Sequence, residues 1–273
     1  MLRATSPKYN PAGLRSALSI MLPLIVLDFD GVICDSAPEN AATAWHVCQF
    51  LWPERFPAGD VPPEAIPRFC AVRPYMETGY QAILMTRLMQ EDAPAEQYTT
   101  ALAQWQPRNL ARLGLAKSEL QKLFGAERDR WIATDLDGWL SYNRYYGGAA
   151  EALQTLRERA RVVILTTKER RFVQQLMRRE HIDFAAEDIY GLHEIVNKET
   201  TLAQFVNSGE YSSVTFVEDR LATLQRTLAV PALADLRLAY ATWGYTTPEQ
   251  RADAARNPRI VSLDSPAALA TLA

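Results

Sequence analysis

The sequence predicts an α/β protein, with a parallel sheet as its core and a helical cap domain inserted into that core. Short apolar runs alternate with helical patterns in the second half of the chain. Several of these runs end in polar residues, as expected where parallel strands present their carboxyl ends to a ligand. Between the first and second apolar runs lies a long, mostly helical stretch, which predicts the insertion.

The first apolar run, at residues 24–28, reads as a buried strand that ends in carboxylates. Four consecutive apolar residues precede Asp28, and Asp30 and Gly31 follow directly. A run without polar alternation is typical of parallel strands covered on both faces. Two carboxylates at a strand end repel each other unless a cation or a shared proton holds them. The pattern therefore predicts a Mg²⁺-dependent nucleophile site.

Residues 37–143 are expected to form the helical cap domain. Pro38 suits the N-terminus of its first helix, and prolines interrupt regular structure over 52–67. No convincing strand lies between 36 and 147. Helical patterns occupy residues 39–51, 74–92, 95–112 and 116–133.

The rest of the chain, 144–273, is expected to complete the core together with residues 21–36. Strands are predicted at 162–165, 182–184, 189–191, 214–217 and 236–240, the last of which is the last clear strand. Helices are predicted at 149–160, 169–180 and 198–207. This alternation favours right-handed βαβ units and a Rossmann-like parallel sheet.

Composition excludes several classes of partner. A net charge of −3 provides no basic field for nucleic acid, and no apolar run approaches the ~20 residues that span a bilayer.

Three cysteines without metal-ligand spacing suit a reducing cytoplasm better than a disulfide scaffold. Residues 1–20 carry little hydrophobic content and are expected to be a disordered extension. The oligomeric state is left open.

Polar groups at other strand ends are expected beside the two aspartates. Thr166 follows the second strand, and Glu218 and Asp219 follow the strand at 214–217. Lys198 begins the helix that leads into that strand. Carboxylates for a hard cation, a hydroxyl and an ammonium are the groups that phosphoryl transfer requires. A free carboxylate attacking phosphorus would form an aspartyl-phosphate.

These motifs resemble those of the haloacid dehalogenase superfamily of phosphohydrolases. The first motif of that family, a strand followed by Asp-x-Asp-Gly-Val, is matched at 28–32, and the other three are matched at Thr166, Lys198 and the pair 218–219. The matching core covers about 24–36 and 147–262. Thr-Thr-Lys at 166–168 and Thr-Trp-Gly-Tyr at 242–245 further resemble the phosphoglycolate-phosphatase-like subgroup, which carries a helical cap at this point of the chain.

The resemblance implies a phosphatase of small phosphorylated metabolites. Asp28 would be the nucleophile and a Mg²⁺ ligand. Asp30 would be the general acid/base and would ligate the metal through its main-chain carbonyl. Family members that cleave carbon–halogen bonds lack the second aspartate, so Asp30 favours phosphate chemistry.

The resemblance also assigns the remaining motif residues. Thr166 and Lys198 would hold the phosphoryl oxygens, and Thr167 is a further candidate for substrate binding. Asp219 would be the third metal ligand. Glu218 would lie beside it as a ligand or as a neighbour of the ligands.

The fourth motif departs from the usual pattern of the family. Members often carry another acid four or five residues after the pair, where this chain has Thr223 and Leu224. The departure implies a less acidic metal site and leaves open a catalytically weak binding or regulatory protein. A phosphomutase is a second alternative. A phosphonate-cleaving relative would need a cap lysine, and Lys117 and Lys122 are not clearly placed for that role.

A few residues outside the motifs have competing interpretations. Arg73 either reaches the substrate from the cap or is a surface arginine. Lys168 is an alternative cation for the site, although a solvated helix-start position is the favoured interpretation. Tyr245 is expected to pack against the sheet edge. The letters Asp-Leu-Asp-Gly at 135–138 repeat the first motif but follow a charged helical run, so they are interpreted as a helix end.

Overall fold

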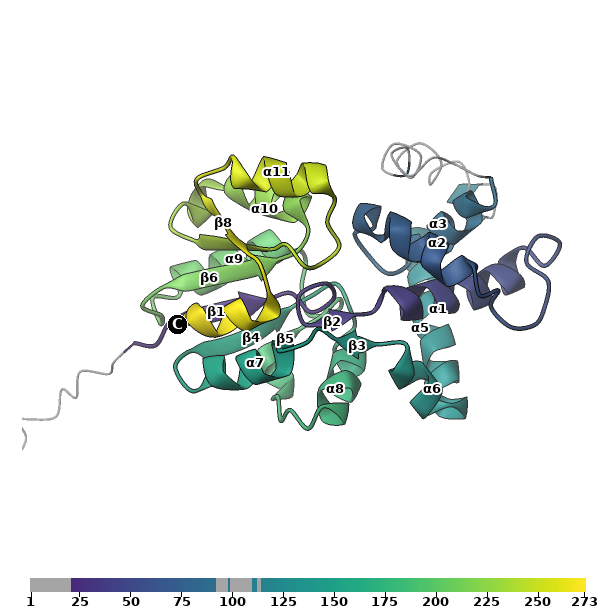
Figure 1. Ribbon diagram of the computed structural model, residues 1–273, viewed down its shortest axis with the longest axis horizontal. Coiled ribbons are helices and arrows are strands. Elements are labelled where there is room, and N and C mark those ends of the chain that lie inside the picture. The colour runs from purple at the N-terminus through teal and green to yellow at the C-terminus, as the bar shows by residue number, and fades with distance from the viewer. Residues whose placement is uncertain (1–20, 92–97, 99–109, 112–113) are drawn as a thin grey trace, which may run out of the picture.

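A parallel sheet between helical layers forms one part of the molecule, and a group of helices forms the other (Figure 1). The computed structural model describes residues 21–91, 98, 110–111 and 114–273. The expected N-terminal extension and most of the helix expected at 95–112 lie outside the described residues. In the described part of the chain, no helix combines the length and the apolar character needed to cross a membrane.

The sheet has six parallel strands in the order β5-β4-β1-β6-β7-β8. The first strand of the chain lies in the middle, because β1 pairs with β4 on one side and with β6 on the other. All four residues of β1 are buried, as its continuous apolar run predicts. The strands are β1 (Leu24–Leu27), β4 (Arg161–Leu165), β5 (Ile189–Tyr190), β6 (Val214–Glu218), β7 (Arg237–Ala241) and β8 (Ile260–Leu263).

Helices cover both faces of the sheet. Ile25 and Leu27 point to one face, where they pack with α7, α8 and the 3₁₀ helix η5. Leu24 and Val26 point to the opposite face and join the cluster that includes α9, α10 and α11. The elements are α7 (Ala149–Arg157), α8 (Arg170–Arg179), α9 (Lys198–Asn207), α10 (Leu221–Leu228), α11 (Pro248–Ala255) and η5 (Pro266–Thr271). The prediction of a Rossmann-like parallel sheet is therefore confirmed.

Three details of the predicted strands are wrong. The strand β8 follows the one that was expected to be last. It was missed because the run is short, Ser262 interrupts its apolar residues, and Val261 and Ser262 are exposed. Residues 182–184 are not a strand, although Ile182 and Phe184 are buried in the core. A two-residue strand, β3 (Arg144–Tyr145), pairs antiparallel with β2 (Cys34–Asp35) in a region where no strand was expected.

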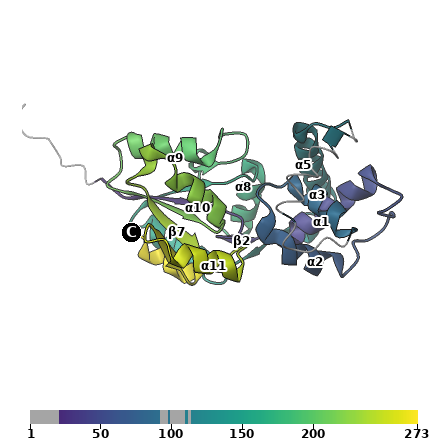
Figure 2. The same cartoon turned by 90° about the horizontal axis from the view of Figure 1, so that it is seen from above.

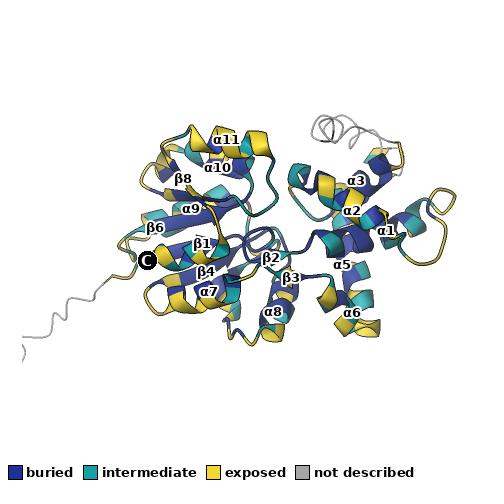
Figure 3. Cartoon of the chain, viewed as in Figure 1, coloured by how far each residue is buried: buried dark blue, intermediate teal, exposed yellow. Residues whose placement is uncertain are grey.

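The helices between β2 and β3 form a second apolar cluster, and we call residues 37–141 the helical insertion. Figures 1 and 2 show it to one side of the sheet, beyond the end of β1. Its buried residues, which include Trp45, Phe69, Leu84 and Leu120, pack in one cluster. Figure 3 colours the helices of the insertion by burial. Its helices are α1 (Ala37–Leu51), α2 (Ala65–Val72), α3 (Gln81–Met89), α5 (Lys117–Thr134) and α6 (Leu136–Ser141).

The second Asp-x-Asp-Gly sequence lies at the junction of α5 and α6. Asp135 caps α6, since its Oδ1 accepts a hydrogen bond of 2.9 Å from the backbone N–H of Gly138. An N-cap carboxylate satisfies one of the free N–H groups at a helix start. The interpretation of these letters as helix-terminal residues is confirmed.

Candidate active site

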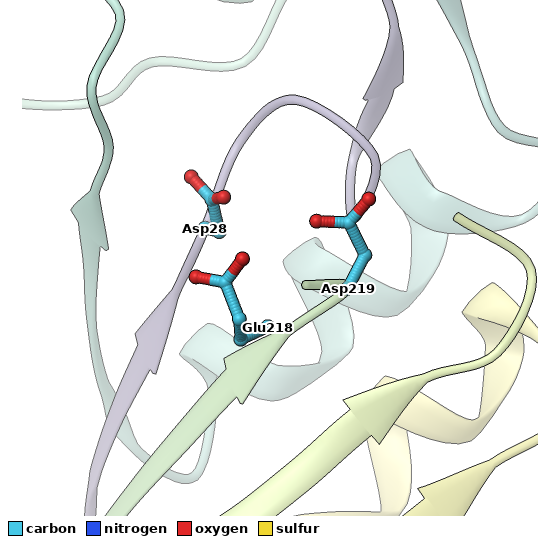
Figure 4. A group of neighbouring side chains, drawn as sticks. All are labelled: Asp28, Glu218 and Asp219. Atoms are coloured by element: carbon cyan, nitrogen blue, oxygen red, sulfur yellow. The ribbon is translucent and has the colours of Figure 1, made fainter. Parts of the chain in front are cut away.

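Three carboxylates converge where β1 and β6 end. Asp28 follows β1, Glu218 is the last residue of β6, and Asp219 comes next. Leu27 pairs with Val217, so the segments that follow β1 and β6 leave the sheet side by side. One oxygen from each carboxylate lies within 4.8 Å of the others, and all three residues are buried (Figure 4).

The electrostatics of this cluster favour a bound cation. Burial, together with the charges of Glu218 and Asp30, raises the pKa of Asp28 to about 7 despite the neighbouring Lys198. Burial and the charges of Glu218 and Asp28 raise the pKa of Asp219 well above its usual value. A divalent cation would relieve both effects, and convergent carboxylate oxygens are the donors that Mg²⁺ prefers. The donor set therefore fits such an ion.

Two turns, one containing Gly31 and the other Gly244, lie in close contact with Asp219. A Cβ on Gly31, where φ is +89°, would lie 1.9 Å from Asp219 Oδ2, and one on Gly244 would lie 2.4 Å from Asp219 Cβ. The backbone N–H of Tyr245 donates a 2.7 Å hydrogen bond to Asp219 Oδ2. The turns thus fix the orientation of this carboxylate, and Gly31 is required both for its φ and for the space it leaves.

Lys198 lies between two of the carboxylates. Its Nζ is 2.9 Å from Asp28 Oδ2 and 2.7 Å from Glu218 Oε2. Burial opposes its charge, but the two carboxylates outweigh burial and raise the pKa of Lys198 above its usual value. It is the first residue of α9, and Asn197 caps that helix by accepting from the N–H of Thr200. Lys198 therefore stays cationic beside the candidate nucleophile.

Asp30 makes a different set of contacts. Its Oδ1 accepts a 2.7 Å hydrogen bond from Ser36 Oγ and lies 3.1 Å from Lys168 Nζ. Burial opposes ionisation, but Lys168, Ser36 and more distant arginines outweigh it, and the pKa of Asp30 is lowered. The prediction that Lys168 is a solvated helix-start residue is wrong. Lys168 is 3% exposed, because it lies in the turn before α8 and folds toward Asp30.

The two threonines after β4 differ in their surroundings. Thr166 is buried, and its Oγ1 accepts a hydrogen bond from the N–H of Lys168 at 3.1 Å. Thr167 Oγ1 donates to the carbonyl oxygen of Glu77 at 3.3 Å, which connects the core with the helical insertion. Both threonines border the same cavity as Asp28.

Arg73 enters the site from the helical insertion. It is 7% exposed, so the interpretation as a surface arginine is wrong. Its guanidinium carbon lies 3.9 Å from the centre of the Tyr245 ring. Arg73 Nε is buried and has no hydrogen-bond partner among the described residues.

Tyr245 is a site residue and does not simply pack against the sheet edge. Its hydroxyl accepts hydrogen bonds from the N–H groups of Ser36 (2.7 Å) and Ala37 (3.0 Å). The same hydroxyl donates to Asp35 Oδ1 at 2.9 Å. Tyr245 therefore connects the core with the start of α1, and its ring packs against the guanidinium of Arg73.

A cavity of about 350 Å³ lies between the core and the helical insertion, and its lining includes Asp28, Thr166, Lys198 and Arg73. This size suits a small molecule. Glu77, at its rim, holds the two parts together, since its Oε1 lies 2.8 Å from Arg226 Nη2 and 3.3 Å from Arg220 Nη1. Apolar residues also border the cavity, namely Met76, Tyr80, Leu192, Ile195 and Val196.

The sequence did not reveal a buried ion pair beside the site. Arg128 of α5 makes two 2.7 Å hydrogen bonds to the carboxylate of Glu39 on α1. In the sequence, Glu39 resembles an ordinary acid of a first helical turn, and Arg128 belongs to a run of charged residues. No local signal joins two residues that lie 89 positions apart.

Comparisons with known proteins identify the family of this chain. Residues 22–222 match the family model for haloacid dehalogenase-like hydrolases. A search of curated proteins found no match. The fold is similar to that of solved structures of low sequence identity. One is a provisionally named phosphoglycolate phosphatase from Lactobacillus plantarum, at 14% identity and a TM-score of 0.54, with 90% of this chain and 97% of that chain covered.

Two further structures show the same fold. A provisionally named phosphatase from Clostridium acetobutylicum has 15% identity and a TM-score of 0.56, and the match covers 89% of this chain and 94% of that one. A provisionally named phosphoglycolate phosphatase from Haemophilus somnus has 14% identity and a TM-score of 0.56, with 91% and 96% covered. The family model spans well over half of the sequence, and all four motifs meet at one edge of the sheet. The chain therefore belongs to the haloacid dehalogenase-like hydrolases.

Proposed function

We propose that the protein is a Mg²⁺-dependent phosphatase that hydrolyses a small phosphorylated metabolite through an aspartyl-phosphate. One observation carries the proposal: the carboxylate of Asp28 borders a small cavity together with a lysine ammonium, a threonine hydroxyl and two further carboxylates. Asp28, Glu218 and Asp219 would hold the metal, with the main-chain carbonyl of Asp30. When bound, the ion would supply charge neutralisation for the phosphoryl group.

In the first step, a carboxylate oxygen of Asp28 attacks phosphorus. The new bond joins Asp28 to phosphorus, and the bond from phosphorus to the ester oxygen breaks. Lys198 and Thr166 would hold the non-bridging oxygens, where negative charge develops. Asp30 gives a proton to the departing oxygen, so that the alcohol leaves as a neutral molecule.

In the second step, water attacks the phosphorus of the aspartyl-phosphate. Asp30, now ionised, takes a proton from this water, and the bond between phosphorus and Asp28 breaks to release inorganic phosphate. The lowered pKa of Asp30 keeps this carboxyl group ionised in the substrate-free site, so it must take up a proton before the first step. A phosphoryl dianion beside Asp30 raises its pKa and favours uptake of the proton needed in the first step.

The helical insertion would act as a lid over this chemistry. We propose domain boundaries at 36/37 and 143/144, with residues 37–143 as a cap that opens and closes. Contacts of Glu77 with Arg226 and Thr167 support a closed arrangement, and closure would exclude water before the phosphoenzyme forms. Arg73 and Thr167 are proposed to bind the substrate, because both border the cavity and Arg73 Nε has no other partner in the described structure.

We also propose a reducing compartment such as the cytoplasm. Cys34, Cys48 and Cys70 are free thiols. Burial raises the pKa of Cys34 and Cys48 well above the usual value, so these thiols resist ionisation. Unreactive, unpaired cysteines are typical of proteins that stay in such surroundings.

Turnover of p-nitrophenyl phosphate tests the proposed function. The protein should release p-nitrophenolate when Mg²⁺ is added and stop when EDTA removes it. A screen of phosphorylated metabolites, 2-phosphoglycolate included, would then identify the substrate. Well-folded protein that turns over none of these esters with Mg²⁺ would overturn the proposal and would favour a binding or regulatory role.

A further inference from the structure

A line of buried charges connects Asp30 with the helical insertion. It runs from Arg128 on α5 to Glu39 on α1, then to Lys168, and ends at Asp30. Lys168 Nζ lies 3.8 Å from Glu39 Oε2 and 3.1 Å from Asp30 Oδ1. Arg128, Glu39 and Lys168 are 4%, 0% and 3% exposed. Two carboxylates thus hold one ammonium between them, away from water.

Glu39 is held by several donors besides the lysine. Arg128 gives it two hydrogen bonds of 2.7 Å, and Thr43 Oγ1 donates another at 2.7 Å. Trp139 Nε1, from α6, adds a contact of 3.3 Å. A buried carboxylate is tolerated only when its oxygens are satisfied in this way. Glu39 therefore has a fixed place, and through it so has the ammonium of Lys168.

Arg128 belongs to the insertion but also contacts the core. Its guanidinium carbon lies 4.4 Å from the centre of the Phe124 ring on α5 and 5.2 Å from that of Phe172 on α8. Its Nη2 donates to Asn40 Oδ1 at 3.2 Å, and Asn40 in turn donates to the carbonyl oxygen of Ser36. Through Asn40, Arg128 is therefore also connected to Ser36, which donates the other hydrogen bond to Asp30.

We propose that Glu39 and Arg128 are positioning residues, which place Asp30 through Lys168 for proton transfer to the departing oxygen. The inference rests on the proposed function, because it concerns the acid of that reaction. Without the charge of Glu39, Lys168 loses the second carboxylate that holds it, and its ammonium is free to leave Asp30. Because Glu39 belongs to the helical insertion and Lys168 to the core, the docking of the insertion controls the placement of the acid.

The test compares two esters of nearly the same shape. Phenyl phosphate has a poor leaving group, phenolate, which needs a proton. The p-nitrophenolate of p-nitrophenyl phosphate leaves well without one. The measured quantity is kcat/KM for phenyl phosphate divided by kcat/KM for p-nitrophenyl phosphate. Glu39→Gln and Arg128→Met should lower this ratio about tenfold or more, since a misplaced general acid forfeits part of a 10²–10⁴-fold contribution. Lys168→Met should lower it similarly.

The ratio separates a positioning role from a structural one. Partial unfolding lowers both kcat/KM values equally and leaves the ratio unchanged. Glu127→Gln is the matched control, since Glu127 precedes Arg128 on the same helix but pairs with Arg130 and His46, and it should keep the wild-type ratio.

Two results would overturn the inference, and they are distinguishable. If the wild type is active but Glu39→Gln and Arg128→Met keep its ratio, the positioning role is wrong and the proposed function stands. If the wild type hydrolyses neither ester with Mg²⁺, the proposed function fails and the inference fails with it.

Discussion

Lys198 Nζ lies 2.9 Å from Asp28 Oδ2, so the candidate nucleophile is ion-paired with the residue proposed to receive the phosphoryl oxygens. The same ammonium contacts Glu218 at 2.7 Å. This arrangement keeps two buried carboxylates in place before substrate arrives. It also means that Lys198 contributes both to stability and to the proposed chemistry, and that the two contributions are measurable separately.

Replacing Lys198 by Met should reduce both activity and stability. Loss of the cation that stabilises the developing charge should lower kcat about 10²–10³-fold. Removing one partner of a buried ion pair destabilises a protein by about 3–5 kcal/mol, because the other charge is left uncompensated. Steady-state kinetics and thermal unfolding, each with and without Mg²⁺, measure the two effects. Destabilisation should be smaller with Mg²⁺, and an equal loss in both conditions would argue against a shared metal site.

The metal-free protein should lose stability as the pH rises through the titration of Asp28. Its pKa is raised from 3.8 to about 7, so the folded state binds more protons than the unfolded state between these values. Stability contributed by the protonated form is therefore present below about pH 4 and is lost as the pH approaches 7. Thermal unfolding in EDTA from pH 5 to 8 measures this, with Asp28→Asn as the comparison.

The same titration should affect metal binding, because Mg²⁺ competes with the proton on Asp28. The rise in Tm caused by Mg²⁺ should be larger at pH 8 than at pH 6 in the wild type. Asp28→Asn should show a smaller rise and a weaker pH dependence. Equal Mg²⁺-induced shifts at both pH values in the wild type would contradict the assignment of Asp28 as a ligand.

Gly31→Ala should disturb the metal site more than its backbone strain explains. A Cβ at this position would overlap Asp219 Oδ2, so Asp219 must move. Gly209→Ala is a matched control, since Gly209 also has a positive φ, +69°, but no atom lies within 4 Å of an added Cβ. Both variants should lose about 1–2 kcal/mol through strain. Only Gly31→Ala should raise the Mg²⁺ concentration needed for half-maximal activity, and a similar increase in Gly209→Ala would refute this explanation.

Arg73→Met should weaken substrate binding. Met keeps much of the apolar contact with the Tyr245 ring but removes the charge and the unpartnered Nε donor. Loss of a charge-assisted hydrogen bond is worth about 1.5–3 kcal/mol, so KM should rise roughly tenfold or more. Kinetics on the substrate found by the metabolite screen would measure the change. An unaltered KM would show that Arg73 only packs on the ring.

The core and its motif residues were predictable because their signals are local. Leu24–Leu27 form a continuous apolar run, and Asp28, Thr166 and Glu218 each follow or end a strand, so topology alone brings them to one edge. The edge strand Ile260–Leu263 escaped prediction because two of its four residues face solvent. Local patterns of this kind report burial, and an edge strand is only half buried.

Contacts around the site between residues far apart in the chain were not predictable from the sequence. Tyr245 contacts Asp35 across 210 positions, and Arg128 contacts Glu39 across 89. Each residue alone resembles a common surface or packing residue. Their roles arise only in the folded chain, where residues from distant segments meet and a buried charge such as that of Glu39 needs a partner.

The most direct test of the proposed mechanism is mass spectrometry of acid-quenched protein after mixing with Mg²⁺ and a substrate ester. The wild type should carry a phosphate on the peptide that contains Asp28, and Asp28→Asn should carry none and lose turnover while it keeps its fold. An Asp28→Asn variant with turnover near that of the wild type, and no phosphate on the Asp28 peptide of the active wild type, would contradict the assignment of Asp28 as the nucleophile.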